Sequence, residues 1–322
     1  MKKSKTHFDL RIDFQEKYFK KLLPILQKED DFRKTLFNLI KFSVCLFVLF
    51  ATFSSLLPFL FNLFSGAWLN MSKVEFFAPL VMWFACLTVF SLYPRFQRVF
   101  QTNLKEKIMP HVCSCFGDFK WKSEINKTQQ KLIKSSKVLD NNFLDIVCDD
   151  VIFGQYNDVK MEIYDCALHL KSDETKDISL FNGVIFKFDM NKNFLTKTIV
   201  RPKGADNSAL NKFKKTTLED VEFNSSFDVF CEDEVEARYL LTPTFMERLK
   251  RAQSVFKAEK VYCSFYKKYF FLALKTNKNS FNVCKLNKSL LDSKDMIFEM
   301  FEELCCAFDF IEHFKLEQRI GL

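Results

Sequence analysis

The chain has 322 residues, a formal net charge of +8 and a hydrophobic share of 48%, so it is long enough for about two folded domains and is neither strongly acidic nor strongly basic. Its eleven cysteines are scattered, mostly singly, which excludes a small secreted disulfide scaffold and predicts reduced thiols in a cytosolic compartment. Its 41 phenylalanines suit either an aromatic ligand surface or, as we expect, the filling of core and membrane positions.

The first 41 residues predict an amphipathic helical segment on the cytosolic side. Apolar residues recur there at helical spacing, with lysine and arginine on the opposite face. These apolar residues are Phe8, Ile12, Phe19, Leu22, Leu23 and Leu26. The helix either lies along anionic lipid headgroups or packs on the cytosolic domain, and the sequence leaves both alternatives open.

Residues 42–94 predict a transmembrane helical hairpin. The runs 42–64 and 76–94 contain no charged residue, and each is close to the length of about 20 residues that a helix needs to cross a bilayer. Pro58 should kink the first run without ending it. A cleaved signal peptide is disfavoured because the run is too long and begins near residue 40. A buried hairpin in a soluble protein is the other alternative, and it would need a surrounding core that the rest of the chain does not offer.

Basic residues flank both uncharged runs, whereas the short connection between them holds only Lys73. Because positively charged flanks stay on the cytoplasmic side, both termini are predicted to be cytoplasmic and the tip of the hairpin to lie outside. Residues 95–140 then predict juxtamembrane helices, the first of which should end near Pro110.

Residues 141–322 predict a cytosolic α+β domain, an antiparallel sheet with a helical insert and a C-terminal helix. Val184, Phe186 and Phe188 alternate with Ile185, Lys187 and Asp189, so we expect the first set to face the core. The run 295–314 has apolar residues at helical spacing and predicts the C-terminal amphipathic helix. Short alternating or apolar runs that predict strands cover 146–156, 159–170, 183–190, 195–202, 227–232 and a hairpin over 260–275 that turns at Lys267–Lys268.

The helical insert, residues 233–249, predicts two short helices in succession. Asp233 should cap the first helix, with Glu236 reaching back to complete a capping box. Thr242 should cap the second helix, whose first position is Pro243, where a missing N–H costs nothing. We favour the interpretation that this stretch is a corner of the fold that redirects the chain between sheet segments.

Two stretches carry a family resemblance. GVIFKFDMNKNFLTKTIVRP, residues 183–202, and VFCEDEVEARYLLTPTFMERL, residues 229–249, closely resemble the hallmark stretches of a bacterial membrane family described as domain of unknown function 3137. The resemblance implies a helical N-terminus, two spans and a cytosolic domain, and therefore a multi-pass protein of the bacterial inner membrane. It also implies a membrane-protein partner, and it implies no activity or catalytic residue.

The usual chemical motifs are absent from the sequence. The six glycines never cluster, which excludes a dinucleotide fingerprint and a phosphate loop. His111, Cys113 and Cys115 form the best metal candidate, but a tetrahedral zinc site needs a fourth ligand, which would require Cys148 or Cys166 to fold back. We therefore predict no metal and no cofactor, and buried thiols in place of ligands.

Charged clusters admit several interpretations. Asp149 and Asp150 are adjacent, and adjacent strand residues point to opposite faces, so a turn is favoured over a carboxylate pair. The acidic residues 232–236 oppose the basic segment 203–215, which suggests internal pairing, a divalent-cation patch or, as we favour, a solvated surface. The basic residues of 120–137 and 212–215 lack the interleaved aromatics of single-strand binders, so anionic headgroups are favoured over nucleic acid.

The sequence thus predicts a membrane-anchored binding or scaffold module that recognises a protein partner or anionic lipid, without catalysis. Its partners would be the lipid bilayer, a membrane protein and anionic lipid headgroups, with oligomers allowed and no nucleic acid. One alternative is an enzyme with a polar pocket lined by Asp149, Glu162, Asp165 and Arg238; another is an oligomeric transport or channel component. The candidate binding residues are Arg238, Tyr239, Asp233, Glu236 and Asp165.

Overall fold

The structure is a computed structural model that describes residues 7–65, 73–139, 145–170, 178–190, 192–276 and 288–319. The chain divides into two compact units. The sheet unit comprises residues 1–20, 109–282 and 295–322, and the helix unit comprises residues 21–108 and 283–294.

The sheet unit is built on one nine-stranded sheet in the order β1-β2-β3-β4-β9-β8-β5-β7-β6, with antiparallel pairing at every step among the described residues. The strands are β1 (Phe119–Lys122), β2 (Asp145–Tyr156), β3 (Val159–Leu170), β4 (Ile178–Asp189), β5 (Thr198–Pro202), β6 (Lys214–Thr216), β7 (Phe227–Cys231), β8 (Lys260–Tyr266) and β9 (Tyr269–Lys275). All six predicted strand runs are confirmed, and the short edge strands β1 and β6 were not predicted.

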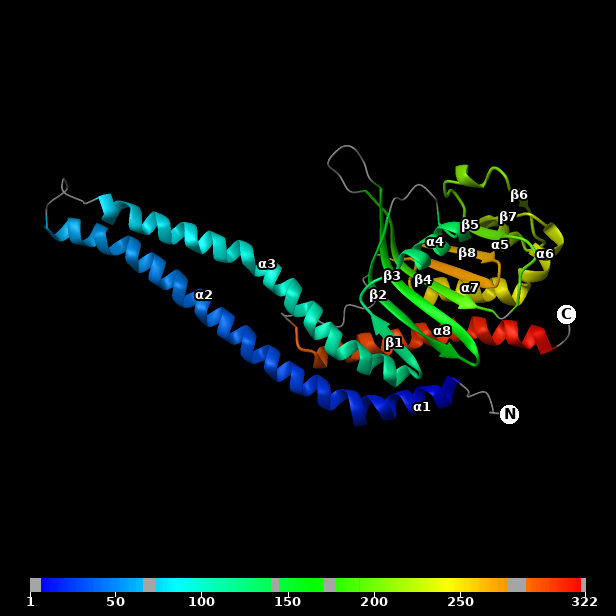
Figure 1. Cartoon of the computed structure of the whole chain (residues 1–322), viewed down its shortest axis with the longest axis horizontal. Coiled ribbons are helices and arrows are strands. Elements are labelled where there is room, and N and C mark those ends of the chain that lie inside the picture. The colour runs from blue at the N-terminus through cyan, green and yellow to red at the C-terminus, as the bar shows by residue number, and fades with distance from the viewer. Residues whose placement is uncertain are drawn as a thin grey trace. The chain divides into compact units, whose positions relative to one another are not determined.

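Some helices belong to the sheet unit, and α2 and most of α3 belong to the helix unit (Figure 1). The elements are α1 (His7–Lys17), η1 (Tyr18–Leu22), α2 (Leu23–Ser65), α3 (Lys73–Phe116), α4 (Lys127–Ser136), η2 (Ser208–Leu210), α5 (Val221–Ser226), α6 (Glu234–Leu240), α7 (Pro243–Val255), η3 (Leu291–Ser293) and α8 (Lys294–Arg319). The predicted C-terminal helix is confirmed as α8, and α3 passes through Pro110 to Phe116 without the predicted break.

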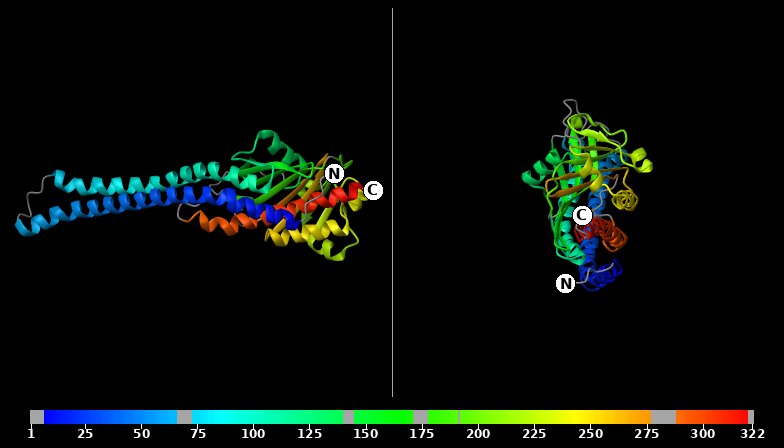
Figure 2. Two further views of the ribbon diagram at one scale, coloured as in Figure 1. Left: turned by 90° about the horizontal axis from the view of Figure 1, so that it is seen from below. Right: turned by 90° about the vertical axis from the view of Figure 1, so that its right-hand side faces the viewer.

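The helices α7 and α8 run side by side along the sheet (Figure 2). Phenylalanine side chains of both helices pack against phenylalanine of β9. The ring of Phe245 on α7 lies 5.6 Å from the ring of Phe270 on β9, between centroids, and Phe310 on α8 lies 5.6 Å from the same ring. All three side chains are almost completely buried. In this unit the abundant phenylalanine therefore fills the core, as the sequence predicted.

The opposite face of the sheet is covered too, because α4 packs on it. Ile133 of α4 belongs to a buried cluster with Tyr164, Ile185 and Phe271 from the sheet. Val184, Phe186 and Phe188 are buried, as predicted. Ile185, Lys187 and Asp189 on the other face of β4 are at most 8% exposed as well. Within α4 itself the buried residues are Ile133 and Ser136.

The helix unit pairs α2 with the part of α3 before Met109. Lys107 Nζ lies 3.6 Å from a carboxylate oxygen of Glu29 and 5.9 Å from the ring centroid of Phe32. Farther along α2, large apolar side chains are between 53% and 68% exposed. These side chains are Leu39, Phe42, Leu46, Leu49, Phe50, Phe53 and Leu56.

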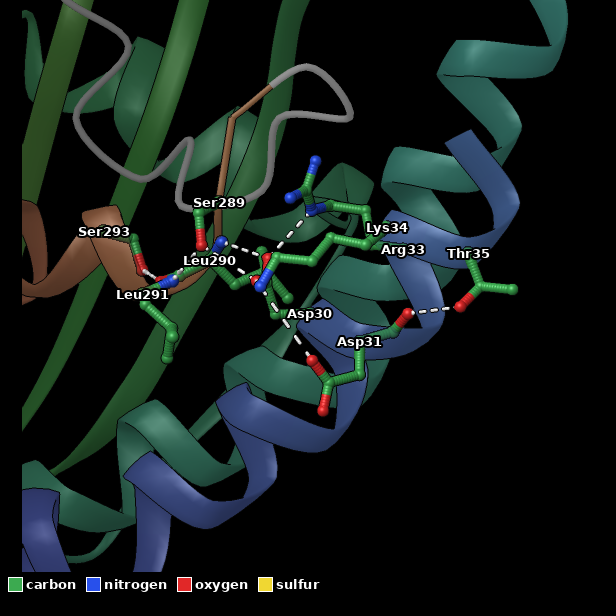
Figure 3. Close-up of polar contacts among 9 residues, drawn as sticks. All are labelled: Asp30, Asp31, Arg33, Lys34, Thr35, Ser289, Leu290, Leu291 and Ser293. Atoms are coloured by element: carbon green, nitrogen blue, oxygen red, sulfur yellow. Dashed lines mark hydrogen bonds and ion pairs between the residues drawn. The ribbon is translucent and has the colours of Figure 1, made fainter. Parts of the chain in front are cut away.

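A buried carboxylate ties η3 to α2 in the helix unit (Figure 3). Asp30 is completely buried, and it accepts hydrogen bonds from the backbone N–H of Leu290 (2.7 Å) and the hydroxyl of Ser289 (2.9 Å). Its oxygens also lie 2.9 Å from Arg33 Nε and 2.9 Å from Lys34 Nζ. Burial opposes ionisation of Asp30, but these bonds outweigh it and hold the pKa of the carboxyl well below its ordinary range.

Within the described ranges, no helix combines the length and the apolar character needed to cross a membrane. This finding contradicts the predicted transmembrane hairpin, the multi-pass inner-membrane localisation and the assignment of both termini to the cytoplasmic side of a membrane. The uncharged runs 42–64 and 76–94 are not separate helices, because α2 and α3 continue into charged segments that hold Asp30, Arg33 and Arg98. Of the predicted fold class, the antiparallel sheet with its helices is what the structure contains.

Candidate functional site

The predicted helical corner, residues 233–249, forms as two helices with the expected caps. Asp233 accepts hydrogen bonds from the backbone N–H groups of Val235 (2.7 Å) and Glu236 (3.3 Å), which satisfies the free N-terminal donors of α6. Thr242 accepts a hydrogen bond from Phe245 N at the start of α7 (3.3 Å), with Pro243 at the first helical position. Both predicted N-caps are therefore confirmed.

The predicted capping box is wrong, because Glu236 binds a neighbouring loop instead. Its carboxylate accepts hydrogen bonds from the backbone N–H groups of Leu195 (2.8 Å) and Thr196 (2.7 Å). Glu232 accepts a third bond, from Lys197 N (2.8 Å). The acidic residues around α6 therefore hold the segment 195–197, which leads into β5, in a fixed conformation.

Two other predicted binding residues lie on α6 and also have partners. Arg238 donates from Nη2 to the backbone carbonyl of Thr217 (3.1 Å) and is exposed. Tyr239 carries Lys192 Nζ above its ring, 4.8 Å from the centroid. Glu236, Arg238 and Tyr239 join two connecting segments to α6, the one between β4 and β5 and the one that follows β6.

Asp165 does not join the other predicted binding residues. It lies on β3, opposite Asp150 of β2, and is 4% exposed. Four strands separate β3 from β7, the strand that leads into α6, and neighbouring strands are about 4.8 Å apart. The candidate binding residues thus fall into two separate places.

The residues of the enzyme alternative are not gathered either. Glu162 and Asp165 are three positions apart on the regular strand β3, so they point to opposite faces of the sheet. Glu162 pairs with Lys187 Nζ (2.7 Å) and accepts a hydrogen bond from Gln129 Nε2 (2.7 Å). Burial opposes its ionisation, but these bonds and one from Tyr164 lower the pKa of Glu162, so it acts as a structural anion between α4 and the sheet.

Three lysines and two aromatic rings alternate in space beside the C-terminal end of α4. Lys137 Nζ lies 5.3 Å and Lys197 Nζ 5.8 Å from the ring centroid of Phe213. Lys197 Nζ also lies 4.3 Å from the ring centroid of Tyr266, and Lys267 Nζ lies 5.3 Å from that same centroid. These distances are those of cation–π contacts. We call these five residues the lysine–aromatic cluster.

The last backbone carbonyl groups of α4, which have no partner within the helix, position this cluster. Lys197 Nζ donates to the carbonyl of Ser135 (3.0 Å), and Arg201 Nη2 donates to the carbonyl of Lys137 (2.9 Å). The hydroxyl of Ser264 on β8 donates to the carbonyl of Ser136 (2.6 Å). Because the last carbonyls of a helix lack intrahelical partners and carry its negative pole, they attract cations, and here they fix Lys197 in place.

The cluster carries concentrated positive charge. Burial lowers the pKa of Lys197, and the nearby charges of Lys137 and Lys267 lower it further, while Glu232 raises it. None of the three lysines forms an ion pair with a carboxylate in the described part of the chain. Each keeps N–H donors that could meet an anion.

Other lysines of the sheet unit are paired. Lys203 and Lys215 both lie on Asp228, with Nζ to Oδ1 distances of 2.7 and 3.0 Å. Lys214 lies 3.0 Å from Glu234. Of these contacts, Lys214–Glu234 joins the acidic residues 232–236 to the basic segment and supports internal pairing there.

The best metal candidate in the sequence has no ligand geometry. His111 is exposed at the end of α3, whereas Cys113 and Cys115 are buried. Burial raises the pKa of Cys113 to about 12, so it is a neutral thiol. Asp149 and Asp150 lie in strand β2, not in the favoured turn, and only Asp150 is buried. The described residues contain no group of three or more His, Cys, Asp or Glu that could hold a metal ion.

Residues 179–316 match the family model described as protein of unknown function (DUF3137). The matched segment covers less than half of the chain, so the family assignment applies to residues 179–316. The match confirms the resemblance carried by residues 183–202 and 229–249, and it does not extend to the predicted two-span plan or to a bacterial source. The DUF3137 segment holds α6 and four members of the lysine–aromatic cluster, but not Lys137.

Comparison with curated proteins gives no match. Among solved structures, the chain is similar to the crystal structure of the mycobacterial trehalose monomycolate transport factor A, TtfA, at 10% sequence identity. The similarity covers 61% of this chain and 91% of that chain, with a TM-score of 0.35. A likeness of this degree carries no argument about fold or function.

The lysine–aromatic cluster was missed because its members come from four separate segments. The basic segments 120–137 and 212–215 supply one member each, Lys137 and Phe213, and show no aromatic interleaving along the sequence. Interleaving appears only after β5, β8 and the C-terminal end of α4 come together. A search for lysine next to an aromatic residue would have marked Lys212–Phe213 and Tyr266–Lys267, among many others.

Proposed function

We propose that the chain is a binding module, without catalysis, that recognises a phosphate-bearing group of its partner through the lysine–aromatic cluster. The observation that carries the proposal is the convergence of Lys137, Lys197 and Lys267 with no ion-paired carboxylate among the described residues. Like charges held this close repel one another, and an anion between them removes that repulsion.

The chemistry of the cluster favours a phosphate over a simple carboxylate. A phosphate offers several strong acceptor oxygens, and three ammonium groups with spare donors match them. The contacts with Phe213 and Tyr266 already restrict the three ammonium groups, so less side-chain freedom is lost when the anion binds. The α6 corner supports the site indirectly, since Glu232 and Glu236 fix the segment that carries Lys197.

The proposal is tested by calorimetric titration of the full chain with glycerol phosphate and inorganic pyrophosphate. Lys267→Met removes one positive charge at an exposed turn. Lys197→Met removes the positive charge that lies beside both aromatic rings of the cluster. Because a hydrogen bond to a charged group contributes about 1.5–3 kcal/mol, each change should weaken binding about tenfold or more. Lys203→Met is the matched control, since Lys203 is already paired with Asp228, and it should change affinity little.

The phosphate could belong to a lipid headgroup or to a soluble ligand. Vesicles of phosphatidylcholine with and without phosphatidic acid distinguish these two sources. Co-sedimentation that requires phosphatidic acid and is lost in Lys267→Met would assign the site to a lipid headgroup. Binding of the soluble phosphates alone would assign it to a soluble ligand. Absence of binding to every phosphate probe, or equal losses in Lys267→Met and Lys203→Met, would refute the proposed function.

A further inference from the structure

Two cysteines face each other across neighbouring strands of the sheet unit. Cys148 of β2 and Cys166 of β3 are direct partners in the strand register, and both have free thiols. They are 8% and 3% exposed and belong to the buried cluster on the α4 side. Neither residue belongs to the lysine–aromatic cluster.

The hairpin geometry determines what kind of pair they form. The turn residues Asn157 and Asp158 have φ values of 47° and 64°, as in a type I′ turn, so the closing pair of the hairpin is hydrogen-bonded. Hydrogen-bonded and non-hydrogen-bonded pairs then alternate along β2 and β3. Following the register back from the turn makes Asp150–Asp165 a hydrogen-bonded pair.

A β-bulge lies between this pair and the cysteines. The register shifts between Cys148 and Asp150, so two residues of β2 stand opposite Asp165. The next pair, Cys148–Cys166, is therefore non-hydrogen-bonded, a type in which the Cα atoms are about 4.5 Å apart and the side chains approach closely. A disulfide needs Cα atoms about 4.4–6.8 Å apart, so the strands need no rearrangement to accommodate one.

The thiols are also in contact. A hydrogen bond with Cys148 and then burial raise the pKa of Cys166 well above its ordinary value. Cys166 is consequently a poor first nucleophile, whereas Cys148 is the more exposed thiol and sits beside the bulge, where the strand ladder is interrupted. This difference assigns the order in which the two residues react.

We propose that Cys148 and Cys166 form an intrachain disulfide when the chain meets a low-molecular-weight disulfide of the glutathione class. Cys148 gives up its proton to water, and its thiolate attacks one sulfur of the oxidant, which breaks the S–S bond of the oxidant and releases one reduced thiol. Cys166 then gives up its proton, attacks the sulfur of Cys148 and releases the second thiol. Two electrons and two protons pass from the chain to the oxidant.

The bond would lock the β2–β3 hairpin across its bulge. It closes the loop 149–165 in the unfolded chain and so reduces the number of unfolded conformations. Because α4 packs on the same buried cluster, the bond would also stabilise the helix whose C-terminal carbonyls hold Lys197. We expect the Tm of the oxidised chain to rise by about 5–10 °C.

The test uses the full chain, equilibrated in glutathione buffers of graded oxidation and then alkylated, digested and analysed by mass spectrometry. A peptide pair linked between Cys148 and Cys166 is expected, with formation favoured as the buffer becomes more oxidising. Cys263→Ser, which removes a fully buried cysteine of β8, should leave the linked pair and the rise in Tm unchanged. Cys166→Ser should abolish both and leave Cys148 as a mixed disulfide.

The wild-type chain alone decides the proposal if a variant fails to fold. Recovery of both residues as alkylated thiols, or as separate mixed disulfides, in the most oxidising buffer would overturn it. Linkage of either residue to a different cysteine would overturn it as well.

Discussion

The two units use the same residue types in opposite ways. In the sheet unit, Phe245, Phe270 and Phe310 are almost completely buried between the sheet and the helices α7 and α8. On α2 of the helix unit, Phe42 and Phe50 are 68% and 61% exposed. The difference teaches that a high phenylalanine content does not predict the environment of the side chain, and that the same substitution should have very different costs in the two units.

The largest expected effect is a cavity in the sheet unit. Phe270→Ala removes a ring that packs against Phe245, Phe265 and Phe310, and should lower the free energy of unfolding of the sheet unit by about 3–5 kcal/mol. The matched substitution Phe50→Ala on α2 should change it by less than about 0.5 kcal/mol, since the side chain is exposed. Hydrogen exchange measured by mass spectrometry reports the two units separately, and equal losses of protection would contradict the comparison.

A pH effect comes next, and it belongs to the sheet unit. Burial, followed by the charge of Arg248, lowers the pKa of His313 from 6.5 to about 4. The unfolded chain therefore binds an extra proton between pH 6.5 and pH 4, so the stability contributed by neutral His313 is present above pH 6.5 and is lost as the pH falls to about 4. The slope should be on the order of 1 kcal/mol per pH unit.

Urea unfolding of the wild type and of His313→Phe measures this slope. The variant should lose the decline in this pH window, since phenylalanine has no proton to bind. A variant that declines as steeply as the wild type would assign the effect to other groups.

The helix unit should respond at lower pH. The pKa of Asp30 is depressed, so its contribution to stability is present above its unfolded pKa of about 3.9 and is lost only as the pH falls below that value. Asp30→Asn removes the charge that Arg33 and Lys34 bind, and should cost about 2 kcal/mol at neutral pH. Exchange protection of Leu290 N–H reports the change, with Asp31→Asn as the exposed control.

The smallest expected effect is the loss of a helix cap. Asp233→Ala leaves the N–H groups of Val235 and Glu236 without their acceptor and should cost about 1 kcal/mol. Asp233→Ser should restore most of this loss, because serine also caps helices well. Thermal unfolding of the three proteins measures the difference, and a full loss in Asp233→Ser would show that the charge matters more than the cap.

Features encoded by local sequence were predicted well. The strand alternation, the N-caps Asp233 and Thr242 and the turn at Lys267 each depend on residues close together in the chain, and all three are present in the structure. The burial of both faces of β4 was not predictable, because it depends on α4, which approaches from more than forty residues away in the sequence. The predicted transmembrane hairpin is wrong for the described residues, in which no helix is long and apolar enough to cross a membrane; α2 and α3 extend beyond the uncharged runs into charged segments.

The candidate site shows the same limit. Local pattern placed Asp233 and Glu236 on one helix, but it could not show that Glu236 reaches the loop before β5. The lysine–aromatic cluster depends entirely on contacts between segments that are distant in sequence. Its detection requires the packing of α4 on the sheet, which no short-range pattern encodes.

The order of strands has a consequence for biosynthesis. β4 pairs with β9, and Asp189 lies opposite Tyr269. The middle of the sheet therefore cannot form until the ribosome has synthesised β9. Until then the β2–β3–β4 meander has one unpaired edge rich in phenylalanine, the kind of edge that invites aggregation in a nascent chain. Because the β4–β9 pair closes a long connection, such a topology entails slow folding.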